Sequence, residues 1–267
     1  MPKLSINEST TRLWSFEQDV LAYQECGVDA LGVQRQKVAE FGEERAIELL
    51  AETRLRVSNL VGGGGFTGAG GRGFRDSVQD ALAGIELAAE LRAGCFVLTS
   101  GPRWGHTTNH ARRLVVDALK ELAPAARERQ VRLALEPTHR SYADRESFVS
   151  TLDDAIELID GAGQAEVGVV LDTHHVGQED RLIEKIEEHA GRIAIVQLGD
   201  WSDLGEGRGG RARLGEGTLP LKHIVRSLDA AGYDGFYDVE VSSDGISESE
   251  YPELLRQSRD AFEALWE

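Results

Sequence analysis

The sequence predicts one (β/α)8 barrel, the TIM-barrel fold, from the order of its segments, its length and the way its strands end. Short apolar runs alternate with helical segments along the whole chain, which is typical of a parallel sheet. Eight such β-then-α units in 267 residues fit a barrel, because this fold takes about 250 residues. Four successive apolar runs also end on a carboxylate or an amide. A closed barrel brings those ends together, whereas a doubly wound open sheet would spread them along a line.

The first half of the chain supplies four of the β-then-α units. Strands are predicted at 4–6, 30–33, 55–61 and 95–100, and helices at 16–26, 38–53, 77–91 and 109–129. Apolar residues at helical spacing indicate the helices, and alternation of apolar with polar residues indicates the third strand. Pro124 is expected to interrupt the fourth helix, because proline lacks the N–H that the helix needs.

The second half of the chain supplies four more β-then-α units. Strands are predicted at 131–136, 167–172, 193–197 and 236–241, and helices at 147–159, 180–188, 219–231 and 251–266. The chain shows neither a linker nor a shift in composition, so we expect one domain over residues 1–267.

Three loops stand out between these segments. Residues 62–73 are the most glycine-dense stretch and contain G-x-G spacings, but no GK[ST] follows, so a loop over the barrel mouth is favoured over a phosphate-binding loop. Residues 101–108 mix cationic, aromatic and hydroxyl groups, and we count Trp104 among the substrate-binding residues. Residues 199–214 form a long loop before the seventh helix.

Composition narrows the classes of partner. Hydrophobic residues make up 41% and charged residues 28% of the chain, as in ordinary globular proteins. The net charge of -17, with no basic stripe, argues against nucleic acid or an anionic membrane surface as partner. The first residues carry no signal peptide pattern, and the two cysteines suit reduced core positions. We therefore expect a cytoplasmic protein, and self-association into a homo-oligomer stays open.

The four strand endings predict a metal site. Glu136, Asp172, Gln197 and Glu240 each close a largely apolar run. Any one of them alone would be a capping or surface group, but together they form an all-oxygen ligand set at one mouth. Oxygen donors favour hard divalent cations, so manganese is the first choice, with magnesium or cobalt as alternatives. Without such an ion, three adjacent carboxylates would repel one another.

Histidines lie close to two of these ligands in the sequence. His174 and His175 follow Asp172 within three residues, and His175 is expected to reach a substrate oxygen or the metal. We expect His174 only to bond the loop backbone. His139, three residues after Glu136, is a further substrate-binding candidate.

Several motifs in this region carry a resemblance to a known family. They are Leu135-Glu-Pro137, Leu171-Asp-Thr-His-His175, Val196-Gln-Leu-Gly-Asp200, Gly215-Glu-Gly217 and Asp238-Val-Glu240. Together they resemble the sugar phosphate isomerase/epimerase group with its xylose-isomerase-like barrel, over nearly the whole chain and most strongly from 131 to 244. Members of this group include ketose 3-epimerases, hydroxypyruvate isomerases and inosose dehydratases.

The resemblance implies roles for individual residues. Glu136, Asp172, Gln197 and Glu240 would hold the divalent ion, and His175 would touch substrate oxygens. Arg211 looks like the arginine that clamps the substrate, with Arg213 as the alternative. The third ligand is often histidine in the family, and Gln197 keeps the set all-oxygen here. The extra histidines of the endonuclease-like members are not seen, which argues against DNA repair chemistry.

These parts predict an isomerase or epimerase of a small sugar, ketose or polyol-derived keto compound. The ion would polarise the carbonyl, and Glu136 and Glu240 would remove and return a proton through an enediolate. Loss of a β-hydroxyl at the same site would instead give a dehydratase of an inosose or similar compound. A barrel that only binds, as an accessory subunit, is the alternative from another class.

Overall fold

The barrel is closed by eight parallel strands. The computed structural model describes residues 2–68, 71–203 and 209–267. Around the barrel the order is β1, β10, β7, β6, β5, β4, β3, β2, and every neighbouring pair is parallel. The strands are β1 Lys3–Asn7, β2 Ala30–Gln34, β3 Arg56–Gly64, β4 Phe96–Thr99, β5 Leu133–Glu136, β6 Val167–Asp172, β7 Ile193–Leu198 and β10 Phe236–Val239. The predicted fold class is therefore confirmed.

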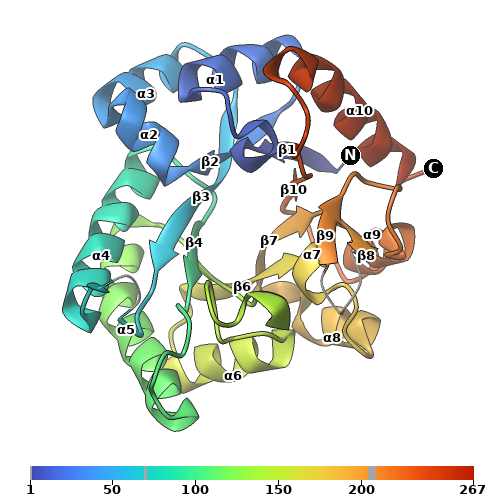
Figure 1. The fold of residues 1–267 in the computed structure, drawn as a ribbon. Coiled ribbons are helices and arrows are strands. Elements are labelled where there is room, and N and C mark those ends of the chain that lie inside the picture. The colour runs from blue at the N-terminus through green and yellow to red at the C-terminus, as the bar shows by residue number, and fades with distance from the viewer. Residues whose placement is uncertain (1, 69–70, 204–208) are drawn as a thin grey trace.

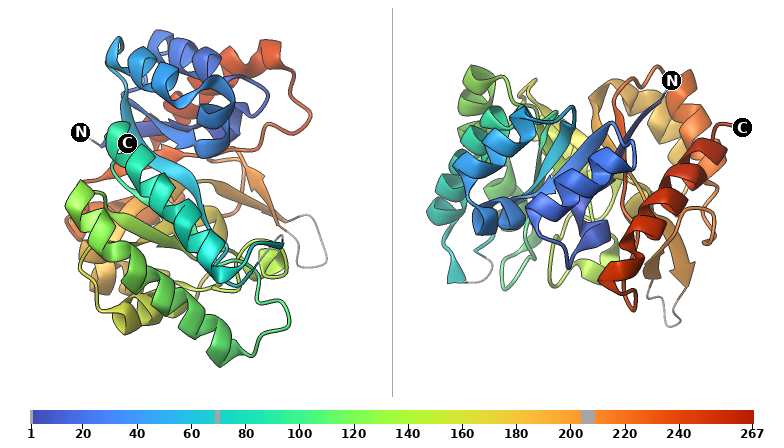
Figure 2. Two further views of the ribbon diagram at one scale, coloured as in Figure 1. Left: turned by 90° about the vertical axis from the view of Figure 1, so that its left-hand side faces the viewer. Right: turned by 90° about the horizontal axis from the view of Figure 1, so that it is seen from above.

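Helices form a ring around the outside of the barrel (Figures 1 and 2). They are α1 Phe16–Glu25, α2 Arg35–Phe41, α3 Glu43–Ala51, α4 Phe74–Glu90, α5 Thr108–Arg129, α6 Leu152–Ala162, α7 Thr173–Val176, α8 Leu182–His189, α9 Leu221–Ala230 and α10 Tyr251–Ala264. Short 3₁₀ turns are η1 Glu8–Thr11, η3 Arg140–Tyr142, η4 Ala190–Arg192 and η5 Glu248–Glu250. No helix in the described ranges is long and apolar enough to cross a membrane.

The side chains that point into the barrel form layers, and the candidate metal ligands belong to one of them. Ala134, Val170 and Ile195 belong to a small buried cluster that is separate from the main core between strands and helices. Side chains alternate between the two faces of a strand, so residues two positions further on share the face of these three. Those residues are Glu136, Asp172 and Gln197. The barrel interior therefore carries an apolar layer with the candidate ligands above it.

Several predicted helices differ from the structure in their bounds or in their continuity. Helix α5 continues through Pro124, because the proline ring is exposed and the carbonyl that loses its partner can bond water. The predicted helix 38–53 is two helices, broken at Gly42 with φ of 104°. Helix α4 begins three residues before the predicted 77. Helix α6 begins at Leu152, where Thr151 caps it by accepting from Asp154 N, and not at 147.

The long loop 199–214 contains structure that the sequence did not predict. Strands β8 Asp200–Asp203 and β9 Gly209–Ala212 pair as an antiparallel hairpin outside the barrel sheet. The hairpin projects from one end of the barrel in Figure 2. The first three residues of the predicted loop 62–73 extend β3 instead. Residues 69–70 and 204–208 of these two loops lie outside the described residues.

Candidate active site

Four oxygen-bearing side chains lie at the carboxyl ends of adjacent strands. Glu136 ends β5, Asp172 ends β6, and Gln197 is the last residue but one of β7. Strand β10 ends at Val239, so Glu240 is the first residue after the strand and not its last residue. Glu240 N still donates to Leu198 O of β7 at 2.8 Å. Because β10, β7, β6 and β5 are consecutive in the barrel, all four groups lie along one side of its mouth.

Arg211, on strand β9, links two of these carboxylates. Its Nη2 donates to Asp172 Oδ2 at 2.6 Å and its Nη1 to Asp172 Oδ1 at 3.2 Å. Its Nη2 also lies 3.5 Å from Glu240 Oε1. The guanidinium is thus a single cation in contact with a group of buried acids, and the hairpin is the element that brings it there.

His175 faces the same carboxylates from helix α7. Its Nδ1 accepts a hydrogen bond from His139 N at 3.2 Å. A neutral imidazole that accepts at Nδ1 carries its proton on Nε2. That Nε2 lies 3.8 Å from both Glu136 Oε1 and Asp172 Oδ2. His175 Nε2 therefore lies between two acids but beyond hydrogen-bond distance of either, and its position fits a metal-ligating cluster with them.

Burial and charge give the three acids different proton affinities. Burial, reinforced by the charges of Asp172 and Glu240, raises the pKa of Glu136 well above its usual value. Burial also raises the pKa of Glu240, against the opposing charge of Arg211. Burial would raise the pKa of Asp172 too, but the charge and hydrogen bond of Arg211 together with the neighbouring imidazoles of His175 and His174 outweigh it, and the pKa falls to about 2. Glu136 and Glu240 are thus the groups suited to exchange protons, while Asp172 stays ionised.

The donor set fits a divalent ion. Gln197 is 2% exposed, and its Oε1 is buried without a hydrogen-bond partner among the described residues. A buried amide oxygen with no donor costs free energy unless something positive satisfies it. Glu136, Asp172 and Glu240 lie at the neighbouring strand ends, and when all three are ionised they carry more negative charge than Arg211 balances. An oxygen-ligated cation would satisfy both needs.

Sequence reasoning missed an aromatic wall beside the acids. The ring of Trp201 lies 4.7 Å from that of His139 and 5.1 Å from that of His174. The ring of Tyr142 lies 5.3 Å from that of His175, and its hydroxyl lies 3.3 Å from His174 Nε2. The position of Trp201 next to the Val-Gln-Leu-Gly-Asp motif is a signal that could have found it. Tyr142 ends the short 3₁₀ turn η3 and offered no such signal.

The hairpin is fixed at its base by two residues that were also missed. Asp200 is 1% exposed and accepts from four backbone N–H groups, those of Trp201, Gly215, Gly217 and Leu219, at 2.8–3.1 Å. Thr173 Oγ1 donates to Gly199 O at 2.6 Å. These bonds explain why Asp200 follows Gly199 in the Val196–Asp200 motif. They also explain the turn at Gly215-Glu-Gly217, whose backbone N–H groups bind Asp200.

The other residues predicted to bind substrate, Arg213, His139 and Trp104, lie at different distances from the acids. Arg213 Nη1 donates to Gln257, so of the two arginines only Arg211 contacts the acids. His139 contacts His175 through its backbone N–H, and its ring packs against that of Trp201 at an interplanar angle of 59°. Trp104 is 61% exposed with φ of 47°. Within the described ranges, no ring contact or hydrogen bond joins the Trp104 side chain to the acids.

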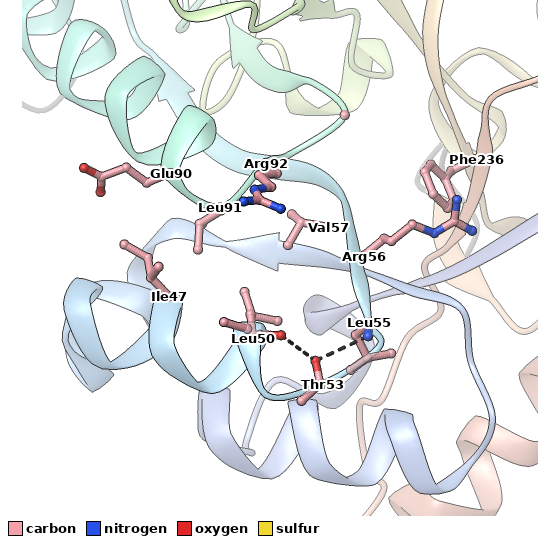
Figure 3. A pocket seen from close by; sticks show the side chains of 12 residues that line it. Ile47, Leu50, Thr53, Leu55, Arg56, Val57, Glu90, Leu91, Arg92 and Phe236 are labelled. Atoms are coloured by element: carbon pink, nitrogen blue, oxygen red, sulfur yellow. Dashed lines mark hydrogen bonds between the residues drawn. The ribbon is translucent and has the colours of Figure 1, made fainter.

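A cavity lies at the other end of the barrel. It measures about 570 Å³ and is lined by residues that include Leu50, Arg56 and Phe236 (Figure 3). Arg56 and Phe236 begin strands β3 and β10, and the Arg56 guanidinium lies 4.7 Å from the centre of the Phe236 ring. The site of Glu136 lies at strand ends, so this cavity is not part of it.

Comparisons with known proteins find similarity to a sugar epimerase and to inosose isomerases. A D-psicose 3-epimerase from Enterocloster bolteae is 29% identical over 125 residues, which cover 46% of this chain and only 38% of the epimerase. An inosose isomerase from Halalkalibacterium halodurans is 26% identical over 56% of this chain and 53% of its own length. An inosose isomerase from Bacillus velezensis is 22% identical over 98% of this chain and 96% of its own length.

Solved structures agree with the fold. A protein from Sinorhizobium meliloti 1021 superposes with a TM-score of 0.86 at 30% identity, covering 97% of this chain and 98% of its own. The IOLI protein with a bound zinc atom gives a TM-score of 0.85 at 20% identity, covering 98% and 97%. The family profile for the xylose isomerase-like TIM barrel matches residues 20–265. The chain therefore belongs to the xylose isomerase-like TIM-barrel family.

Proposed function

We propose that the protein is a divalent-metal-dependent isomerase or epimerase of a small sugar or keto-polyol. The observation that carries the proposal is the unpartnered Gln197 Oε1 beside Glu136, Asp172 and Glu240 at the barrel mouth. Relatives named as a sugar epimerase and as inosose isomerases support the class of reaction. A relative with a bound zinc atom supports a divalent ion.

The four oxygen ligands would hold the ion, with manganese as our first choice. When bound, it would act as a Lewis acid on a substrate carbonyl next to the carbon that loses its proton. Glu136 or Glu240 takes that proton and the other returns it, because both have raised pKa values and both adjoin the site. His175 donates from Nε2 to a substrate oxygen, and its pKa, lowered to about 3 by burial, keeps it neutral.

The aromatic wall adds a binding surface for the substrate. Tyr142 is partly exposed and presents an aromatic face next to polar groups, as binding sites for small polar molecules do. Trp201 is 5% exposed and packs against the rings of His139 and His174. An inosose is a second candidate substrate class, since the inosose isomerase of Bacillus velezensis matches along 98% of this chain. Dehydration at the same acids would be the alternative reaction for such a ring.

Metal analysis tests the proposal first. Protein equilibrated with Mn²⁺ and passed over a desalting column should retain about one ion per chain, as expected for one set of oxygen ligands. Asp172→Ala should retain none, while Asp229→Ala, which removes an exposed acid on α9, should retain as much as wild type. Retention by Asp172→Ala equal to wild type would contradict the site. Turnover should then be sought with ketoses, inososes and hydroxypyruvate, with and without chelator.

A further inference from the structure

The contact between Arg211 and Asp172 has a consequence for how the ion binds. Both oxygens of Asp172 accept from the guanidinium, at 2.6 and 3.2 Å, in the two-pronged geometry that arginine forms with carboxylates. Asp172 Oδ1 also accepts from His174 N at 2.8 Å. A divalent ion needs a lone pair of the same carboxylate, and two cations at such short range repel each other.

The same contact holds the hairpin over the mouth. Trp201 and Arg211 are paired across β8 and β9, so the guanidinium and the indole move with one element. Gly199 leaves room for the arginine, because a Cβ there would lie 2.5 Å from Arg211 Nη1. Arg211 Nη1 also lies 3.5 Å from Glu240 O. The arginine therefore ties β9 to the ends of β6 and β10.

We propose that Arg211 and the divalent ion compete for Asp172, so that the ion releases the arginine and loosens the β8–β9 hairpin. This inference rests on the proposed function, because it requires an ion at these ligands. Once released, the guanidinium keeps its charge next to Glu240 and is free to meet a substrate oxygen. Arg211 thus acts as a positioning residue that lowers the affinity for the ion and links ion binding to access at the mouth.

Metal affinity measured by calorimetry with Mn²⁺ tests the competition. Arg211→Met should bind Mn²⁺ at least about tenfold more tightly than wild type, as expected when two coupled ligands no longer compete. Arg211→Lys keeps the charge but cannot form the two-pronged contact, so its affinity should lie between the two. Arg213→Met removes a charge close by that bonds Gln257, and it should match wild type.

Hydrogen exchange supplies a second readout that does not depend on activity. In wild type, Mn²⁺ should raise the exchange of backbone amides in 200–203 and 209–212, and in Arg211→Met the ion should leave that exchange unchanged. If wild type binds Mn²⁺ but Arg211→Met binds it equally or less tightly, with an unaltered circular dichroism spectrum, the competition is wrong. If Arg211→Lys equals wild type, bulk charge and not the contact sets the affinity, and the inference is also wrong. If wild type binds no divalent ion, the proposed function fails with it.

Discussion

Single residues at the mouth divide into those suited to hold the ion and those suited to move a proton. Arg211, together with the imidazoles of His175 and His174, lowers the pKa of Asp172 to about 2 against the effect of burial, so that acid stays an anion. Glu136 and Glu240 have raised pKa values, because burial and neighbouring acids oppose their ionisation. A general acid or base works best when its pKa is close to the working pH. The division of labour follows from the surroundings of each carboxyl group.

Replacing each proposed base by its amide separates chemistry from ion binding. Glu136→Gln and Glu240→Gln keep an oxygen for the ion but cannot carry the proton. Each should lower kcat by roughly 10²–10⁴-fold, the usual contribution of general acid–base catalysis. Metal content, measured in parallel, should stay close to that of wild type. Near-normal turnover of Glu240→Gln would show that Glu240 is a ligand only.

A second group of acids, remote from the ligands, predicts a pH dependence of stability. Glu8 and Asp19 are both buried, and Lys37 Nζ lies 2.5 Å from Asp19 Oδ2. Burial raises the pKa of Asp19 to about 6, and burial with the charge of Asp19 raises the pKa of Glu8 well above its usual value. In the unfolded chain both acids would titrate near ~4. The folded protein therefore holds protons that the unfolded chain releases.

The free energy of unfolding should fall as pH rises from about 4 through 6 and above, because the unfolded chain binds fewer protons there. Glu8→Gln keeps an acceptor for Gln34 N and removes the charge, so it should flatten this fall and be more stable than wild type at pH 8. Urea unfolding at pH 5 and pH 8 measures the change in the free energy of unfolding for wild type and for Glu8→Gln. Glu17→Gln, an exposed change on α1, is the control and should follow wild type. A Glu8→Gln protein less stable than wild type at pH 8 would contradict a raised pKa of Glu8 in the folded state.

At the residue scale, the sequence could predict which groups meet but not how they are oriented. Glu136, Asp172, Gln197 and Glu240 were found because each follows an apolar run, a local pattern. The bond from His139 N to His175, and the choice of Arg211 over Arg213, depend on contacts between segments far apart in the chain. Such contacts leave no periodic signal in one sequence.

At the scale of elements, the β8–β9 hairpin shapes the mouth of the barrel, and hydrogen bonds to Asp200 hold the hairpin in place. Asp200→Ala would leave four backbone N–H groups without their acceptor. We expect a loss on the order of 3 kcal/mol in the free energy of unfolding, the range for bonds to a buried charged group. Faster hydrogen exchange should be confined to residues 209–219 and their neighbours. An exchange pattern equal to that of wild type would show that Asp200 does not fix the hairpin.

Element boundaries were predicted well where the pattern was local and long. The barrel strands and the long helices α5 and α10 carry strong periodicity and lie close to their predicted ranges. The break at Gly42 was missed because φ of 104° depends on the path of the chain and not on hydrophobic spacing. The short helix α7 was missed because a run of four residues, capped by Asp172, is too short for a periodic signal.

For the whole molecule, the balance of charge at the mouth links ion binding to stability. Mn²⁺ that binds only the folded state should raise the free energy of unfolding by about 2.7 kcal/mol at a concentration 100 times its Kd. The gain should shrink toward pH 5, because protonated carboxyl groups do not ligate an ion. Melting temperatures with Mn²⁺ and with chelator, at pH 8 and pH 5, measure it. Equal melting temperatures at pH 8 would contradict an ion held by these acids.

Exchange of the substrate's carbon-bound hydrogen with solvent tests the central claim most directly. The Mn²⁺-loaded protein should be incubated in D₂O with each candidate ketose, inosose and hydroxypyruvate, and deuterium located by NMR. The account predicts deuterium at the carbon next to the carbonyl of the true substrate, and incorporation lowered by roughly 10²–10⁴-fold in whichever of Glu136→Gln and Glu240→Gln lacks the acid that removes the proton of that substrate. Turnover of a substrate with no deuterium in product or remaining substrate, or unchanged incorporation by both variants, would contradict proton transfer by these two acids.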